Sequence, residues 1–191
     1  MRGFSYTDSM KTGFVASRLD VKAFAQAAGQ LAAQDTLQKY ERLLQETQGL
    51  GADLPLNWAA TGELRPVPGG PDQVWLHLKI DATLPLTCQR CLGPVDVPVS
   101  ADRAFRFVAD EETAAAQDDD CEEDLLALGH DFDLHALIED EVLMELPHLP
   151  RHEVCPIEVK LAVADEAFEA ETQAKPNPFA VLARLKGDKA S

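Results

Sequence analysis

The sequence predicts an α+β fold in which a curved antiparallel sheet is combined with N-terminal and C-terminal helices. Apolar residues recur at helical spacing near the N-terminus and again after residue 133, whereas residues between about 54 and 108 alternate between apolar and polar. The 191 residues are 46% apolar and 26% charged, the composition of a globular chain. We expect an N-terminal extended and helical element over 1–50 and a main domain over 51–191.

The N-terminal element is predicted to contain one long helix. The first twenty residues are mixed in character and indicate an extended lead-in. From residue 20 to about residue 48, apolar residues recur at three- and four-residue steps. Gly29 lies inside this run and costs about 1 kcal/mol relative to alanine, so a kink or a break into two helices is expected there.

The next block has the period of two that is typical of half-buried antiparallel strands. Strands are predicted over 54–58 and 74–80, on either side of the turn-rich PVPGGPD. Two more are predicted over 82–87 and 95–99, joined by the turn CQRCLG, and a last one over 101–108. Three prolines place strands of this block at sheet edges or bulges: Pro85, Pro94 and Pro98.

An acidic segment follows the predicted sheet. Residues 110–124 read DEETAAAQDDDCEED, with nine acidic residues in fifteen and no aromatic residue. This composition predicts a solvated, mobile loop. The alternative is an acidic segment that attracts a basic partner.

A second helix is predicted after the acidic segment. Asp133 is a suitable N-cap, apolar residues follow at helical spacing, and Pro147 ends the pattern. Three carboxylates, Glu139, Asp140 and Glu141, point about 100° apart on such a helix, so they do not converge as an acid/base pair. We expect a solvated face, except for Glu141, which lies close to the buried side.

The charge of the chain restricts its partners. Seventeen basic and 33 acidic residues give a net charge of −16, which repels phosphate backbones and favours a basic protein partner. No stretch reaches the ~18 consecutive apolar residues of a membrane span. The N-terminus has no apolar core of the kind found in secretory signals. The sequence therefore predicts a cytoplasmic protein that does not enter a membrane.

Two of the four cysteines form the motif Cys88-Gln-Arg-Cys91. Thiols at this spacing in a turn can converge on one tetrahedral metal ion, as in structural zinc sites. His152 and Cys155 repeat the two-residue gap and supply the other half of a Cys₃His site. Cys121 lies among carboxylates, which disfavour its thiolate, so it is not expected to be a ligand.

Other interpretations of CQRC stay open at this point. The thiols can pack without a metal, with His152 as a surface histidine. A thioredoxin-like redox motif needs the cysteine pair at the N-terminus of a helix that follows a strand, whereas proline-rich, strand-like sequence flanks it here. Motifs of serine hydrolases, P-loop proteins, dinucleotide-binding proteins and zinc proteases are missing from the sequence, so no enzymatic activity is predicted.

Three motifs occur in a characteristic order. CQRCLGPVDVPV precedes the acidic segment, DLHALIEDEVLMELPHLPRHEVC follows it, and KPNPFAVLARLK lies near the C-terminus, where its apolar residues are expected to dock. Together they resemble the YceD family, the large ribosomal RNA subunit accumulation proteins, over roughly residues 50–186. The resemblance implies a cytoplasmic bacterial protein without catalytic activity that is needed for synthesis, processing or stability of 23S ribosomal RNA.

The resemblance also implies partners and a metal site. Such proteins are typically encoded beside a small basic protein of the large ribosomal subunit, and opposite net charges steer association. A ribosomal protein or a large-subunit precursor is therefore the expected partner. The zinc-binding pattern of many relatives carries over to Cys88, Cys91 and Cys155, with His152 as the fourth ligand. The alternative function is direct RNA binding through four arginines: Arg65, Arg90, Arg103 and Arg106.

Overall fold

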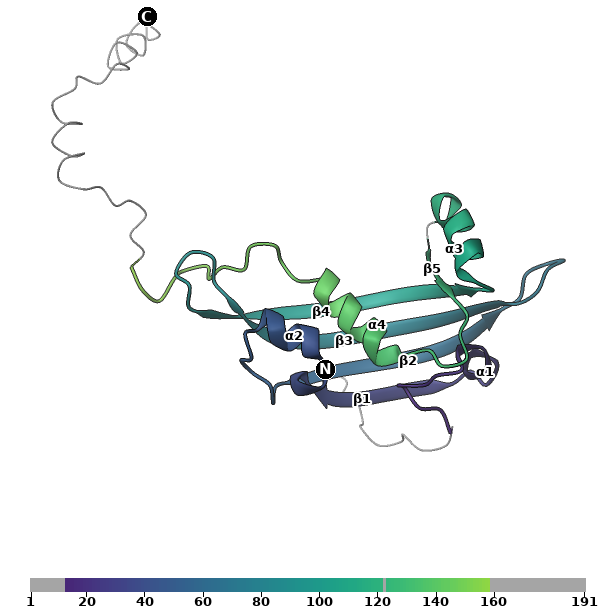
Figure 1. Cartoon of the computed structure of the whole chain (residues 1–191), viewed down its shortest axis with the longest axis horizontal. Coiled ribbons are helices and arrows are strands. Elements are labelled where there is room, and N and C mark those ends of the chain that lie inside the picture. Colours follow the sequence, from purple (N-terminus) through teal and green to yellow (C-terminus); the bar gives the residue numbers. More distant parts are fainter. Residues whose placement is uncertain (1–12, 122, 159–191) are drawn as a thin grey trace, which may run out of the picture. The chain divides into compact units, whose positions relative to one another are not determined.

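The computed structural model describes residues 13–121 and 123–158, so the lead-in before residue 13 and the predicted C-terminal apolar face lie outside the described residues. The fold is that of the compact unit formed by residues 1–154. It contains one five-stranded sheet with the order β1-β2-β3-β4-β5 (Figure 1). The strands are β1 (Gln30–Thr36), β2 (Pro55–Arg65), β3 (Gln73–Thr87), β4 (Pro94–Val108) and β5 (Asp124–Ala127). The first four pair antiparallel in chain order, and β5 pairs parallel to the end of β4.

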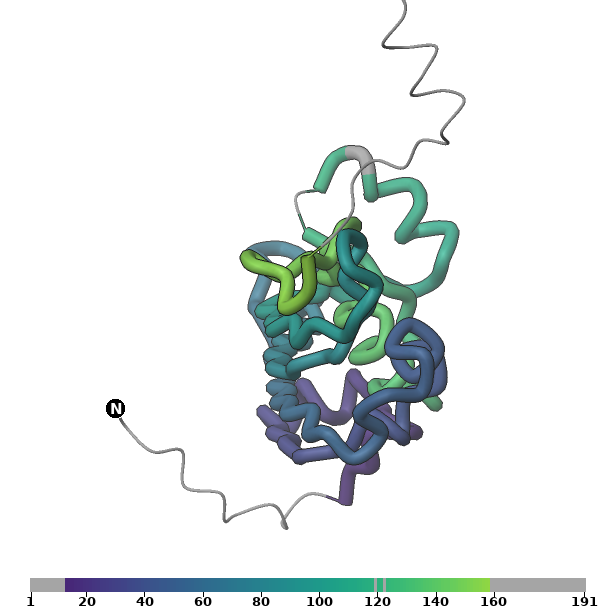
Figure 2. The backbone as a smooth tube through the Cα atoms, turned by 90° about the vertical axis from the view of Figure 1, so that its left-hand side faces the viewer, coloured from purple at the N-terminus to yellow at the C-terminus, as the bar shows by residue number. Residues whose placement is uncertain are grey.

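Helices cover one face of this sheet, so the predicted α+β class is confirmed. In Figure 2, α2 (Glu41–Glu46) and α4 (Leu134–Met144) lie on one side of the stacked strands. Their buried residues join those of α1 (Val21–Gln26) and of alternate strand positions in a single core. On β3, Leu78 and Ile80 belong to this core, while Lys79 and Asp81 are exposed on the opposite face. The sheet therefore has one buried and one solvated face.

The single helix predicted over 20–48 is wrong. Three short elements replace it: α1, β1 and α2, with a 3₁₀ turn, η1 (Leu37–Lys39), before α2. The helical pattern does end just before Gly29, but a strand follows it and not the expected second helix. A Cβ at Gly29 would lie 2.3 Å from Phe24 Cδ2, where the chain folds back on α1. The alanine-rich sequence of β1 fits either period, and its pairing with β2 over seven residues makes it a strand.

The predicted strand pair around PVPGGPD is confirmed as β2 and β3. The predicted strands over 74–80 and 82–87 are one continuous strand, β3, and those over 95–99 and 101–108 are one strand, β4. Pro85 lies beyond the last β2 pairing, Leu56↔Ala82. Pro94 and Pro98 lie on β4 before it reaches β5, whose pairing begins at Phe105. The predicted edge positions of these prolines are therefore confirmed.

The acidic segment contains regular secondary structure, although its charge predicted a loop. α3 (Glu111–Gln117) is followed by a 3₁₀ turn, η2 (Asp118–Asp120), and by β5. Asp110 caps α3, because its carboxylate accepts a hydrogen bond from the backbone N–H of Thr113 at 2.7 Å. The prediction of an unstructured loop is wrong for these elements, and the mobility of the segment stays a prediction.

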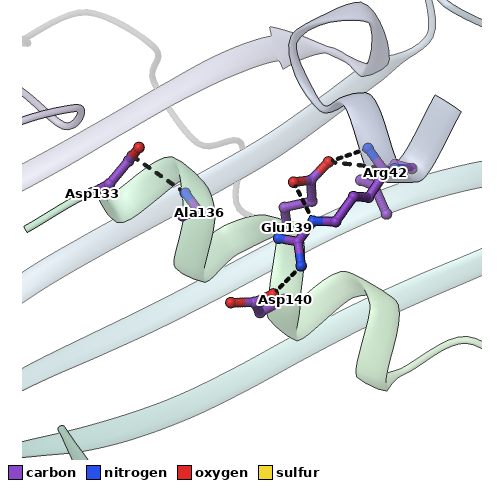
Figure 3. A network of polar contacts seen from close by, with 6 residues as sticks. Arg42, Asp133, Ala136, Glu139 and Asp140 are labelled. Atoms are coloured by element: carbon purple, nitrogen blue, oxygen red, sulfur yellow. Dashed lines mark hydrogen bonds and ion pairs between the residues drawn. The ribbon is translucent and has the colours of Figure 1, made fainter. Parts of the chain in front are cut away.

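The predicted second helix is α4, and its N-cap is confirmed. The Asp133 carboxylate accepts a hydrogen bond from the backbone N–H of His135 at 2.9 Å. It accepts another from the backbone N–H of Ala136 at 3.3 Å (Figure 3). The helix ends at Met144, three residues before Pro147. None of the helices in the described ranges is long and apolar enough to cross a membrane.

Glu139 joins α4 to the N-terminus of α2, where no side chain of α2 itself caps the helix (Figure 3). Its carboxylate accepts hydrogen bonds from the backbone N–H groups of Arg42 and Leu43 at 2.7 and 3.4 Å, and from Arg42 Nε at 2.8 Å. Asp140 accepts a further bond from Arg42 Nη1 at 2.6 Å. The prediction that Glu139 is a solvated carboxylate is wrong, because its side chain is only 12% exposed.

We expect Glu139→Ala to lower the free energy of unfolding by about 1–2 kcal/mol, the usual effect of removing a helix cap. Urea unfolding measures the loss. Asp102→Ala is the matched control, because Asp102 pairs with Lys79 on the exposed face, and surface pairs contribute less than about 1 kcal/mol. Equal losses in the two variants would contradict the role of Glu139 as a cap.

Candidate metal centre

The motif Cys88-Gln-Arg-Cys91 lies in the turn of the β3–β4 hairpin, as predicted. Strand pairing extends to Thr87↔Pro94. The turn is closed by hydrogen bonds from Cys88 N to Gly93 O and from Leu92 N to Cys88 O, each at 2.9 Å. Leu92 has a φ of +59°, in the left-handed region that costs a branched side chain about 1–2 kcal/mol. The hairpin therefore holds the two cysteines in one tight turn at the end of the sheet.

The segment that follows α4 lies against this turn. Gln89 N donates a hydrogen bond to Pro150 O at 2.8 Å. The sulfur of Cys91 lies 3.4 Å from Nδ1 of His152, a residue 61 positions later in the chain. The backbone and side-chain contacts thus bring the two halves of the predicted site together.

The four residues that the sequence singles out form one group. The ligand atoms of Cys88, Cys91, His152 and Cys155 all lie within 4.8 Å of one another, so the four can bind a metal ion. Zn–S bonds of about 2.3 Å and Zn–N bonds of about 2.0–2.1 Å place tetrahedral ligand atoms about 3.5–3.8 Å apart. The distance between Cys91 Sγ and His152 Nδ1 is close to this range.

The surroundings of Cys88 favour a thiolate, although the residue is fully buried. Burial raises the pKa of the Cys88 thiol, because it disfavours the charged form. Hydrogen bonds from the backbone N–H groups of Cys91, His152 and Arg90, and from the His152 side chain, outweigh burial and lower this pKa to about 5. Cys88 is therefore a thiolate at neutral pH, the form that binds metals.

Cys121 is not a member of this group. Its sulfur accepts a hydrogen bond from Arg106 Nη2 at 2.8 Å, near the opposite end of β4 from the hairpin turn.

The redox interpretation of CQRC needs the N-terminus of a helix, whereas the motif here connects two antiparallel strands.

The four arginines proposed for direct RNA binding do not share one surface. Arg65 lies on the solvated face of the sheet, with its Cζ 3.9 Å above the ring of Trp75. Arg106 pairs with Trp75 in the sheet register, while Arg90 is exposed in the hairpin turn. Arg103 points toward the C-terminal end of α4, where the carboxylate of Glu145 accepts a hydrogen bond from Arg103 Nη2 at 3.0 Å.

One buried polar cluster was not predicted from the sequence. Asp35 Oδ2 accepts hydrogen bonds from Trp58 Nε1 at 2.7 Å and from the Tyr40 hydroxyl at 2.9 Å. His135 lies 3.7 Å from the same oxygen, and burial lowers its pKa, so it is neutral at physiological pH. The cluster links β1, β2 and α4. Its residues come from widely separated parts of the sequence, and none of them belongs to the cysteine motifs. No periodicity or spacing marks it.

Comparison with known proteins agrees with the resemblance seen in the motifs. The family model described as "Large ribosomal RNA subunit accumulation protein YceD" matches residues 76–186, more than half of the chain. A protein with this description from Haemophilus influenzae is 33% identical over 110 residues. The aligned part is 56% of this chain and 63% of that protein, less than two thirds of the relative's length. No solved structure matches the chain. The matched range includes all four residues of the candidate metal centre, and the chain belongs to the YceD family.

Proposed function

We propose that this protein is a cytoplasmic, non-enzymatic factor needed for the synthesis, processing or stability of 23S ribosomal RNA, and that it acts in assembly of the large ribosomal subunit. The single observation that carries the proposal is the family match over residues 76–186. The description of that family names the accumulation of large-subunit ribosomal RNA.

The protein acts mainly through contacts with other proteins. Its net charge of −16 repels ribosomal RNA and attracts basic ribosomal proteins. Arg65 and Arg106 lie on the solvated face of the sheet beside Trp75, whereas Arg103 lies on the helical face and Arg90 in the hairpin turn. The four arginines therefore offer no continuous basic surface for an RNA backbone. A ribosomal protein or a large-subunit precursor is therefore the partner that we propose.

Cys88, Cys91, His152 and Cys155 would hold a zinc ion, which would fasten the hairpin turn to the segment after α4. Three cysteines and one histidine are a common ligand set of structural zinc sites, and four protein ligands leave no open position for catalysis. Three thiolates and a neutral imidazole give the occupied site a net charge of −1. The ion would thus stabilise the fold and would have no catalytic role.

Sedimentation of cell extracts tests the proposed function. We expect the tagged protein to migrate with large-subunit precursors and to dissociate as salt rises, because charge attraction is screened over a Debye length of about 8 Å at physiological ionic strength. A pull-down should retain ribosomal proteins after RNase treatment, and loss of the protein should lower 23S ribosomal RNA relative to 16S. Recovery only in free fractions, without ribosomal proteins in the pull-down, would overturn the proposal. Retention that RNase abolishes would instead favour direct RNA binding.

A further inference from the structure

A groove of about 380 Å³ opens on the helical side of the sheet, where α4 faces η2, β5 and the adjoining part of β4. Its lining combines carboxylates with apolar side chains. The carboxylates belong to Asp118, Asp124, Asp140 and Glu141, and Arg103 is the cation among the lining residues. The apolar part includes Leu137 and Met144.

The negative charge of this groove is only partly compensated. Asp140 pairs with Arg42 at 2.6 Å (Figure 3), and Arg103 lies 3.5 Å from Glu141 and 3.0 Å from Glu145. Over the described ranges, Asp118 and Asp124 form no ion pair.

The raised pKa of Glu141 reflects burial and the negative charge around this groove. Burial raises the pKa of its carboxyl group, and the charges of Asp124, Glu145 and Asp140 raise it further. Arg103 opposes this effect without reversing it. A cation that entered the groove would therefore be attracted by several carboxylates at once.

The apolar part of the groove is also open. Met144, the last residue of α4, is 77% exposed, whereas most apolar residues of this helix are buried. Methionine is flexible and polarisable, so it adapts to the side chains of a partner. A ligand of this groove must therefore offer both positive charge and apolar surface.

A metal ion does not meet this description. The group of Cys88, Cys91, His152 and Cys155 is the one that brings three or more possible ligand atoms together in the described part of the chain, and no carboxylate belongs to it. An RNA strand would bring phosphates to a surface that already repels them.

We propose that the groove binds a basic amphipathic segment of a partner protein, whose Lys or Arg side chains pair with Asp118 and Asp124 and whose apolar side chains contact Met144 and Leu137. The inference rests on the proposed function for the identity of the partner, a basic ribosomal protein. The recognition chemistry follows from the groove itself. Opposite charges steer the encounter, and the apolar contact distinguishes a matching segment from any other cation.

Fluorescence anisotropy of labelled peptides tests the groove on the purified full-length protein. One probe is an amphipathic Leu/Lys peptide of about 18 residues, long enough to form a helix. The other replaces each Leu with Ser and keeps the charge. We expect Asp118→Asn/Asp124→Asn to weaken binding of the Leu/Lys peptide at least tenfold, and Met144→Ser to weaken binding of this peptide alone.

The matched control is Asp81→Asn/Asp96→Asn, which removes the same two charges from the solvated face of the sheet, where both residues line another hollow. We expect it to change binding less than twofold. Equal weakening by the two double variants, or equal binding of the two peptides, would reduce the effect to net charge and overturn the inference. Thermal melting checks that each variant is folded.

The same variants separate this inference from the proposed function. Groove-selective peptide binding, combined with loss of co-sedimentation in the Asp118→Asn/Asp124→Asn strain, supports both. Groove-selective binding by a protein whose removal leaves 23S ribosomal RNA unchanged supports the groove and overturns the proposed function. A protein that migrates with large-subunit precursors but binds the peptides without selectivity overturns the groove alone.

Discussion

Purified without chelator, the protein should carry about one equivalent of zinc, whereas Cys88→Ser should carry less than about a tenth of an equivalent. The binding free energy of zinc in structural sites is about 10–16 kcal/mol, and it depends on every ligand. Elemental analysis measures the metal content. Cys121→Ser is the matched control, since it makes the same atomic change outside the group of four. We expect this control to retain zinc.

Removal of the metal should also destabilise the fold. The ion would close a loop of about 60 residues between the hairpin turn and the segment after α4, and closing such a loop restricts the unfolded chain. A chelator should therefore lower the melting temperature of the wild type and leave that of Cys88→Ser unchanged. Less than about a tenth of an equivalent of zinc in the wild type would contradict the site, given the affinity typical of structural zinc.

The candidate metal centre was largely predictable because its ligands occur in two local motifs. The two-residue gap of Cys88 and Cys91, repeated by His152 and Cys155, is visible without a structure. The hydrogen bond from Gln89 N to Pro150 O cannot be predicted from the sequence, because it joins segments whose proximity depends on where α4 ends. Of the hydrogen bonds that lower the pKa of Cys88, those from His152 depend on the same contact, whereas those from Arg90 and Cys91 form within the hairpin turn.

The errors in the fold arise where local sequence permits two structures. The residues of β1 are compatible with a helix, and only their pairing with β2 makes them a strand. In the acidic segment, charge predicted a loop, although Asp110 and the three alanines that follow Thr113 are typical of a capped helix. The sheet from β2 to β4 was clearer, because prolines and alternating apolar residues agree with the final pairing.

Gly62 on β2 should be among the positions least tolerant of substitution, because α1 packs directly on it. A Cβ there would lie 2.7 Å from Phe24 Cδ1 and 2.9 Å from both Cα and N of Ala25. The chain just after α1 is also held against β2, since Gly62 N donates a hydrogen bond to Gly29 O at 2.9 Å. We expect Gly62→Ala to lower the free energy of unfolding by about 3 kcal/mol, near the upper end of the range for overpacking. Urea unfolding measures the loss.

Gly70→Ala is the control for Gly62→Ala, because it adds the same methyl group in the turn between β2 and β3. The nearest atom to its Cβ would be Val67 Cγ1 at 3.5 Å, an ordinary contact. This change should be neutral or stabilise the protein by up to about 1 kcal/mol, since alanine restricts the unfolded chain. The zinc content of Gly62→Ala should stay at the wild-type level, because the cysteine turn lies at the β3–β4 end of the sheet and α1 does not contribute to it. A stable Gly62→Ala variant would show that α1 does not pack on β2 at this position.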